Sequence, residues 1–192
     1  MNRKKIFFIT AVFAVSSVFL IAQTERDKKI EECQPILKAA QELYAKKNID
    51  ASIKKMQEAV KKVPDYHNFY NNLAFLYSQK KDYKNQYLSA SKTVELYELA
   101  KKRGEKRNMT DLFYMNLGAA AVNYSYELRQ KKDLKGEVEL LKEGLKNFKT
   151  FVSLVKTGKE RETALEQIKV IEKDLLPKAE KSLKEKPKTN SK

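Results

Sequence analysis

The chain has 192 residues, of which 42% are hydrophobic, enough for one packed domain or a short repeat array. It contains only 5 glycines and 4 prolines beside abundant helix formers, so its composition excludes a turn-rich all-β protein and predicts an all-α fold. A single cysteine excludes an intramolecular disulfide framework. The 40 Lys and Arg residues against 25 Asp and Glu give a net charge of +15, which favours anionic partners.

Residues 1–22 differ from the rest of the chain. Arg3, Lys4 and Lys5 precede an uncharged and mostly apolar stretch at 6–22, a pattern typical of an export signal. Ala22 is a small residue suited to cleavage, but the stretch is also close to the shortest that can span a bilayer, so a cleaved signal and an uncleaved anchor both stay open. In either case we expect the body to lie outside the cytoplasm, periplasmic or anchored in the inner membrane.

The first predicted helical hairpin covers residues 33–66. Apolar and small residues recur at helical spacing on both sides of a turn at Lys47-Asn48. Pro64 is expected to stop the second helix, because proline cannot continue a helical hydrogen-bond ladder.

A second, longer hairpin is predicted to begin at His67. Its first helix ends before a turn at Lys81-Asp82, and its second helix continues to Lys102. Gly104 is placed to cap that helix, since glycine tolerates the left-handed conformation that often follows a helix end.

A third hairpin and a final helix complete the prediction. Thr110 is the expected N-cap of a helix that extends to about Gln130, and the next helix runs from about Leu134 to a stop at Thr157-Gly158. The final helix is expected to cap the array with one apolar side, formed by Leu165, Ile168, Ile171, Leu175 and Leu176.

Two segments, 70–77 and 114–118, share an aromatic residue, a spacer, Asn, Leu and a small residue. Together with the 34-residue length of the first hairpin and the position of Pro64, this pattern resembles the tetratricopeptide repeat over residues 33–150. The resemblance implies a right-handed superhelix of about three hairpins plus a C-terminal capping helix. We therefore expect a helical domain over 23–182 and a disordered basic tail over 183–192.

The same resemblance implies that the first helix of each hairpin lines a concave binding face. Asparagine both donates and accepts hydrogen bonds, so a row of asparagines suits an extended peptide. The alternative is that Asn72 and Asn116 only bond neighbouring helix backbones. Family members that clamp a C-terminal carboxylate use Lys and Arg there, but the matching places hold Leu37, Gln41, Asn72 and Met115, so this activity is not expected. The candidate protein-binding residues are Asn68, Asn71, Asn72, Phe75, Met115, Ala119, Asn116 and Asn123.

Positive charge is concentrated in one inter-helix segment and in the tail. Most other lysines stand beside glutamates, as on an ordinary solvated helix. The segment could bind an anionic membrane or cell-wall surface, whereas nucleic acid is not favoured because the tyrosines are expected in the core. The candidate residues for this surface are Lys101, Lys102, Arg103, Lys106 and Arg107.

Catalytic motifs are missing from the sequence. No phosphate-binding glycine loop, metal-spaced cluster or serine elbow is found, and His67, the single histidine, is expected at the surface or as a cap. The sequence therefore predicts no enzyme, no cofactor and no metal. It favours an exported tetratricopeptide-like scaffold or adaptor that binds an envelope protein or peptide, with a cationic surface-associated protein as the alternative.

Overall fold

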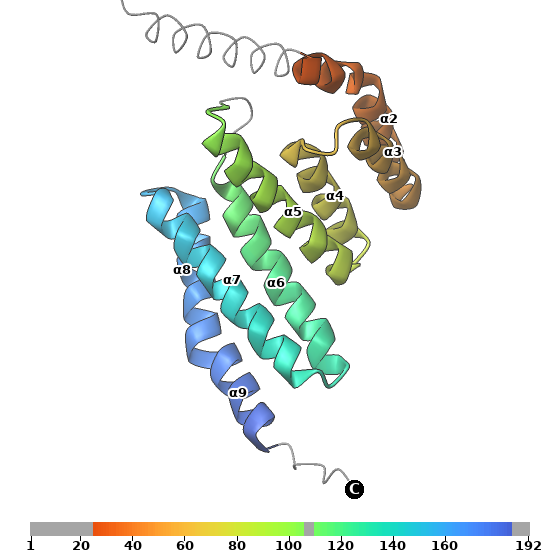
Figure 1. Ribbon diagram of the computed structural model, residues 1–192. Coiled ribbons are helices and arrows are strands. Elements are labelled where there is room, and N and C mark those ends of the chain that lie inside the picture. Colours follow the sequence, from red (N-terminus) through yellow and green to blue (C-terminus); the bar gives the residue numbers. More distant parts are fainter. Residues whose placement is uncertain (1–24, 106–109, 186–192) are drawn as a thin grey trace, which may run out of the picture. The chain divides into compact units, whose positions relative to one another are not determined.

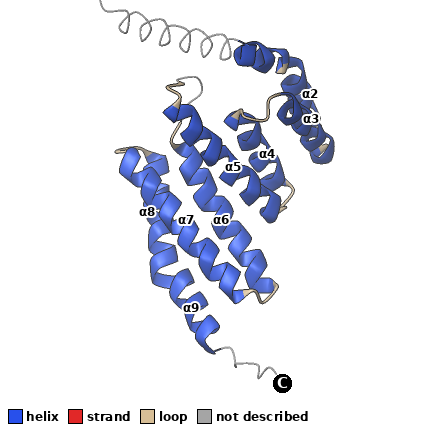
Figure 2. Cartoon of the chain, in the orientation of Figure 1, coloured by secondary structure: helices blue, strands red, loops and turns tan. Residues whose placement is uncertain are grey.

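The computed structural model describes residues 25–105 and 110–185, and every regular element within them is a helix (Figure 2). The prediction of an all-α fold is therefore confirmed. The proposed signal or anchor at 1–22, the basic residues Lys106 and Arg107, and positions 186–192 of the proposed tail lie outside the described residues. In the described part of the chain, no helix is long and apolar enough to cross a membrane.

The chain divides into two compact units, which separate between Tyr66 and His67. This boundary coincides with the boundary that the sequence predicts between the first and second hairpins.

The first unit is a hairpin with a preceding helical segment at residues 25–32. Its two helices are α2 (Gln34–Ala45) and α3 (Ile49–Lys62), which pack against each other. The Ser52 hydroxyl donates a hydrogen bond of 2.7 Å to the Ala40 carbonyl across this contact. Cys33 is completely buried, and burial raises the pKa of its thiol, as expected of a small core residue. The apolar core of the unit consists of Ile30, Cys33, Ala40, Ile53, Met56, Ala59, Val63 and Tyr66.

The second unit contains the remaining described helices. In Figure 1, α4 to α7 lie side by side in chain order, and α8 and α9 pack against α7. The elements are α4 (His67–Gln79), α5 (Tyr83–Lys102), α6 (Leu112–Gln130), α7 (Leu134–Leu154), α8 (Lys159–Val170), a π-helical turn (Ile171–Leu175) and α9 (Leu176–Glu185).

One kind of turn closes each of the three hairpins. The second lysine of each turn has a left-handed backbone, with φ of 60° at Lys47, 60° at Lys81 and 59° at Lys132. The next residue, Asn48, Asp82 or Asp133, then caps the following helix by accepting a backbone N–H bond three residues on. The predicted turns at Lys47-Asn48 and Lys81-Asp82 are therefore confirmed, and Lys132-Asp133 repeats them.

Helices α6 and α7 approach closely at two glycines. A Cβ atom added to Gly118 would lie 3.1 Å from ring carbons of the buried Phe148, and one added to Gly144 would lie 3.2 Å from the Gly118 carbonyl oxygen. Small residues at this contact therefore bring the two backbones together, and one of them, Gly118, is the small residue of the pattern shared by 70–77 and 114–118.

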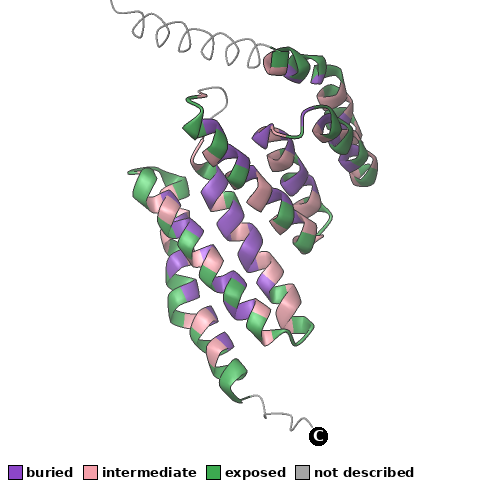
Figure 3. Ribbon diagram, in the orientation of Figure 1, coloured by how far each residue is buried: buried purple, intermediate pink, exposed green. Residues whose placement is uncertain are grey.

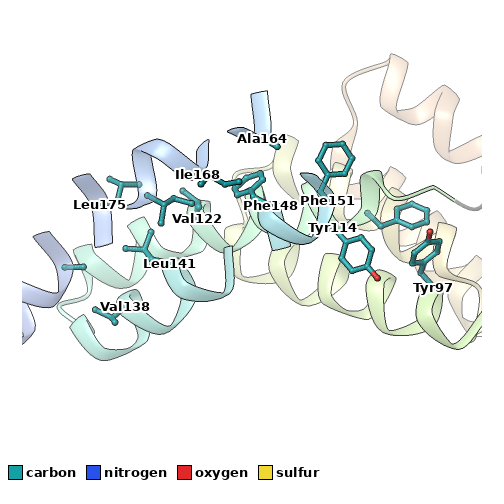
Figure 4. Close-up of a cluster of buried hydrophobic side chains, with 13 residues drawn as sticks. Tyr97, Tyr114, Val122, Val138, Leu141, Phe148, Phe151, Ala164, Ile168 and Leu175 are labelled. Carbon is teal, nitrogen blue, oxygen red and sulfur yellow. The ribbon is translucent and has the colours of Figure 1, made fainter. Parts of the chain in front are cut away.

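The apolar core of the second unit is elongated and lies mainly along α7. In Figure 4, Tyr97, Tyr114 and Phe151 lie toward one end, Phe148 and Ile168 lie in the middle, and Val138 and Leu175 lie toward the other end. Figure 3 shows the buried residues along the meeting faces of α6 and α7. The final helical segment thus contributes its apolar side to this core, as the sequence predicts.

The start of α6 differs from the prediction by one residue. Its N-cap position is Asp111, whose carboxylate accepts the Tyr97 hydroxyl at 2.7 Å and forms no cap. Thr110 instead accepts the Leu112 N–H with its hydroxyl oxygen at 3.3 Å. Asp111 therefore occupies the N-cap position while its carboxylate is engaged in a tertiary contact.

The final helix is not uniform. At its middle the Leu176 N–H donates to the Ile171 carbonyl, five residues back, in the π-helical turn. Pro177 follows directly and has no N–H to donate to the carbonyl of Lys173. The wide turn lets the helix continue through the proline.

Candidate binding site

A pocket of about 280 Å³ lies in the second unit and involves α4, α5 and α6. On α4, Asn71, Phe75 and Ser78 are spaced about one turn apart, so their side chains reach the same side of the helix, and Asn72 and Ala74 flank them. Gln86 comes from the first turn of α5, and two residues three positions apart come from α6. The lining residues are Asn71, Asn72, Ala74, Phe75, Ser78, Gln86, Asn116 and Ala119.

Two side-chain amide pairs connect the helices at this pocket. Asn116 Nδ2 of α6 donates to Asn71 Oδ1 of α4 at 3.2 Å, and Asn123 Nδ2 of α6 donates to Gln86 Oε1 of α5 at 3.3 Å. Asn116 therefore bonds a neighbouring side chain rather than a helix backbone. Asn72 is exposed, and its amide forms no hydrogen bond within the described ranges.

The predicted protein-binding residues largely come together. Asn71, Asn72, Phe75 and Asn116 line the pocket, as does Ala119. Three others do not line it: Asn123 reaches it through Gln86, Asn68 is half-buried, and Met115 packs against the apolar core.

Gln86 and Ser78 also line the pocket, although neither was predicted as a site residue from the sequence. Gln86 is 8% exposed in the first turn of α5, and its place at the pocket depends on how α5 packs beside α4 and α6. Ser78 lies at the end of α4, one turn after Phe75, so helical spacing could have identified it. Its hydroxyl donates to the Phe75 carbonyl at 2.6 Å.

Phe75 gives the pocket an exposed apolar edge. Its side chain is 49% exposed, although it belongs to a helix whose other large apolar residues, Phe69, Leu73 and Leu76, are buried. An exposed aromatic ring beside convergent polar groups is typical of a binding site.

The pocket lining carries no ionisable side chain. This is unusual for a chain in which 34% of the residues are charged. A ligand group entering the pocket would therefore meet amide, hydroxyl and apolar groups but no counter-ion.

Tyrosine hydroxyls bonded to carboxylates hold the surrounding helices together. Tyr97 of α5 donates to Asp111, and Tyr114 of α6 donates to Glu98 of α5, so the two helices exchange a pair of bonds. Burial, followed by the bond to the carboxylate, raises the pKa of both phenols. Tyr87 of α5 donates to Glu143 of α7 at 2.7 Å with the same effect on its pKa. These bonds tie α5, which contributes Gln86 to the pocket, to α6 and α7.

The described part of the basic segment is exposed but partly neutralised. Arg103 pairs with Glu105 at 2.8 Å, and Lys101 lies 3.5 Å from Glu98 and 5.2 Å from the Tyr97 ring centroid. Lys102 is exposed at the end of α5.

The expected surface position of His67 is wrong. The imidazole is completely buried, with its centroid 5.4 Å from that of Phe113 and 6.1 Å from that of Tyr97. Aromatic residues of α5 and α6 cover the start of α4, which local sequence could not reveal. No group of three or more His, Cys, Asp or Glu suited to a metal ion occurs in the described part of the chain.

No protein-family model matches the chain, and neither does any curated protein. The fold and the pocket themselves define the class: an all-α protein of helical hairpins with an uncharged pocket that two successive hairpins line through α4, α5 and α6.

Proposed function

We propose that this protein is an exported, non-catalytic, tetratricopeptide-like scaffold that holds a protein or peptide of the cell envelope in the pocket on α4, α5 and α6. One observation carries the proposal: Asn71, Asn72, Phe75 and Asn116, chosen from the sequence as one face, line a single pocket. The right-handed superhelix and the exported location belong to the same proposal.

The repeated turn supports the tetratricopeptide-like part. Asn48 and Asp82 are 34 positions apart, which is the period of that repeat, and each caps a second helix after a left-handed lysine. The Lys132-Asp133 turn has the same geometry at a longer spacing.

The chemistry of the pocket supports a polypeptide ligand. A peptide unit has one N–H and one C=O, and amide side chains offer both complementary groups. Exposed Phe75 adds an apolar contact for a ligand side chain.

The direct test is capture of proteins from detergent-solubilised envelopes by the full chain, at near-physiological and at roughly 0.5 M salt. We expect a discrete protein at both salt concentrations and its loss with the double variant Asn72→Ala/Phe75→Ala. Leu88→Ala is the matched control, since Leu88 is 51% exposed on α5 and does not line the pocket. Capture that survives the double variant would contradict the site.

A second candidate function rests on the exposed Lys101 and Lys102 and on the net charge of +15. In this alternative the protein adheres to an anionic membrane or cell-wall surface. Exposed charges are screened beyond about 10 Å at 0.1 M salt, so such binding should fall steeply as salt rises. Retention of phosphatidylglycerol vesicles at roughly 0.5 M salt would contradict it.

A further inference from the structure

We infer that the pocket selects an internal segment of its partner and that the side chain entering the pocket is uncharged. The inference rests on the proposed function, because it describes the polypeptide that this same site would hold. It adds a chemical class for the ligand, which the repeat pattern does not give.

The first argument is the hydrogen-bonding capacity that remains after the amide pairs form. Each amide has one oxygen and two N–H groups, and each pair uses one N–H and one oxygen lone pair. Asn71 then keeps its NH2 group and Asn116 keeps its oxygen, so this pair offers donors beside an acceptor. Gln86, which accepts the Asn123 N–H, likewise keeps its own NH2 group. The conclusion holds for either orientation of each amide.

Mixed donors and acceptors match the middle of a peptide better than its end. An internal peptide unit supplies both an N–H and a C=O to such a lining. A C-terminal carboxylate only accepts, so it would offer no donor to the amide oxygen that Asn116 keeps free.

The second argument is the cost of an unpaired charge. A charged group that leaves water without a counter-ion loses solvation free energy, and no residue that lines this pocket could pair with it. Either sign of charge is therefore disfavoured. The positive charge of the chain as a whole does not offset this, because no lysine or arginine lines the pocket.

The third argument is size. At about 280 Å³ the pocket lies just below the roughly 300 to 1,000 Å³ of pockets that enclose a drug-sized ligand. One side chain with its adjoining peptide groups suits this volume, with Phe75 packing against the neighbouring part of the segment.

The test uses the full chain with the photoreactive residue p-benzoylphenylalanine in place of Phe75, or of Leu88 as the control. Leu88 is matched in exposure, at 51% against 49%, and lies away from the pocket lining. The probes are four degenerate peptide pools. Three have both ends blocked and an uncharged, an acidic or a basic central residue, and the fourth is uncharged with a free C-terminal carboxylate.

We expect the blocked uncharged pool to give about tenfold more adduct at position 75 than any other pool, since about 1.4 kcal/mol of discrimination suffices for that ratio. The preference should persist at roughly 0.5 M salt. Equal labelling by a charged or free-carboxylate pool would overturn the inference and leave the proposed function standing. If no pool labels position 75 above position 88, the proposed function itself fails.

Discussion

At the scale of single residues, the hairpin turns hold lysine in a conformation that suits glycine. The left-handed region costs an L-residue roughly 1 to 2 kcal/mol. At Lys47 the turn satisfies the end of α2, because the Asn48 N–H donates to the Leu43 carbonyl at 2.9 Å and the Lys47 N–H donates to the Tyr44 carbonyl at 2.8 Å. The backbone bonds therefore offset the strain.

Lys47→Gly should stabilise the first unit. Glycine removes the strain but loses about 0.4 to 1 kcal/mol through the flexibility that it adds to the unfolded chain, so we expect a net gain of about 0.5 kcal/mol. The measurement is the urea midpoint. Lys46→Gly is the matched control, because Lys46 has φ of −79° and should only lose stability. A lower midpoint for Lys47→Gly would contradict this account of the turn.

Tyr97→Phe should lower stability in a pH-dependent way. At pH 8 the loss of the bond to Asp111 should cost about 1 kcal/mol. The fold raises the pKa of this phenol above its usual value of about 10, so its contribution is complete below that pH and is lost as the pH rises toward the folded-state pKa. The difference between wild type and Tyr97→Phe should therefore shrink above about pH 10.

Urea denaturation at intervals from about pH 8 to pH 11.5 measures this difference. Tyr126→Phe is the control, because the Tyr126 side chain is 42% exposed and forms none of the tyrosine–carboxylate bonds. A difference for Tyr97→Phe that stays constant with pH would show that the hydroxyl acts only through packing.

At the scale of helices, the sequence predicts most boundaries because local signals determine them. Helical spacing, the Lys47-Asn48 and Lys81-Asp82 turns, Pro64 and Gly104 each act within a few residues. The two predictions that were wrong, the N-cap of α6 and the surface position of His67, depend on contacts with other helices. Asp111 is engaged by Tyr97, and His67 is covered by aromatic rings from two other helices.

The close contact between α6 and α7 predicts that a larger residue at Gly144 lowers the stability of the protein. Gly144→Val would place methyl groups where the Gly118 carbonyl oxygen and the Val122 side chain already lie within 3.2 Å of a Cβ position. We expect a loss of about 1 to 3 kcal/mol in the free energy of unfolding. Lys146→Val, on an exposed position of the same helix, should cost no more than about 0.5 kcal/mol. Equal effects of the two substitutions would contradict the close contact.

At the scale of the whole molecule, the two units should differ in stability. The described part of the second unit has the larger set of buried apolar residues. The free energy needed to open a region locally increases with its buried apolar contacts. Amides of α6 and α7 should therefore exchange with deuterium at least about tenfold more slowly than those of α2 and α3. Hydrogen exchange measured by mass spectrometry tests this, and equal protection would mean that the chain opens as one cooperative unit.

Part of the site could be predicted from the sequence, because local helical spacing determines it as it determines the helices. Asn71, Asn72, Phe75 and Asn116 follow from helical spacing on α4 and α6. Gln86 depends on how α5 packs beside them, and the pairing of Asn116 with Asn71 depends on the distance between helices. Neither can be read from one helix alone.

The central claim is that the pocket on α4, α5 and α6 holds a polypeptide, and its most direct test is photocrosslinking in the living cells that make this protein. p-Benzoylphenylalanine replaces Phe75 in one strain and Leu88, equally exposed but away from the pocket, in another. We predict a discrete polypeptide adduct from position 75 that is absent from position 88 and is lost when Asn72→Ala is added. No adduct, or the same adducts from both positions, would contradict the claim.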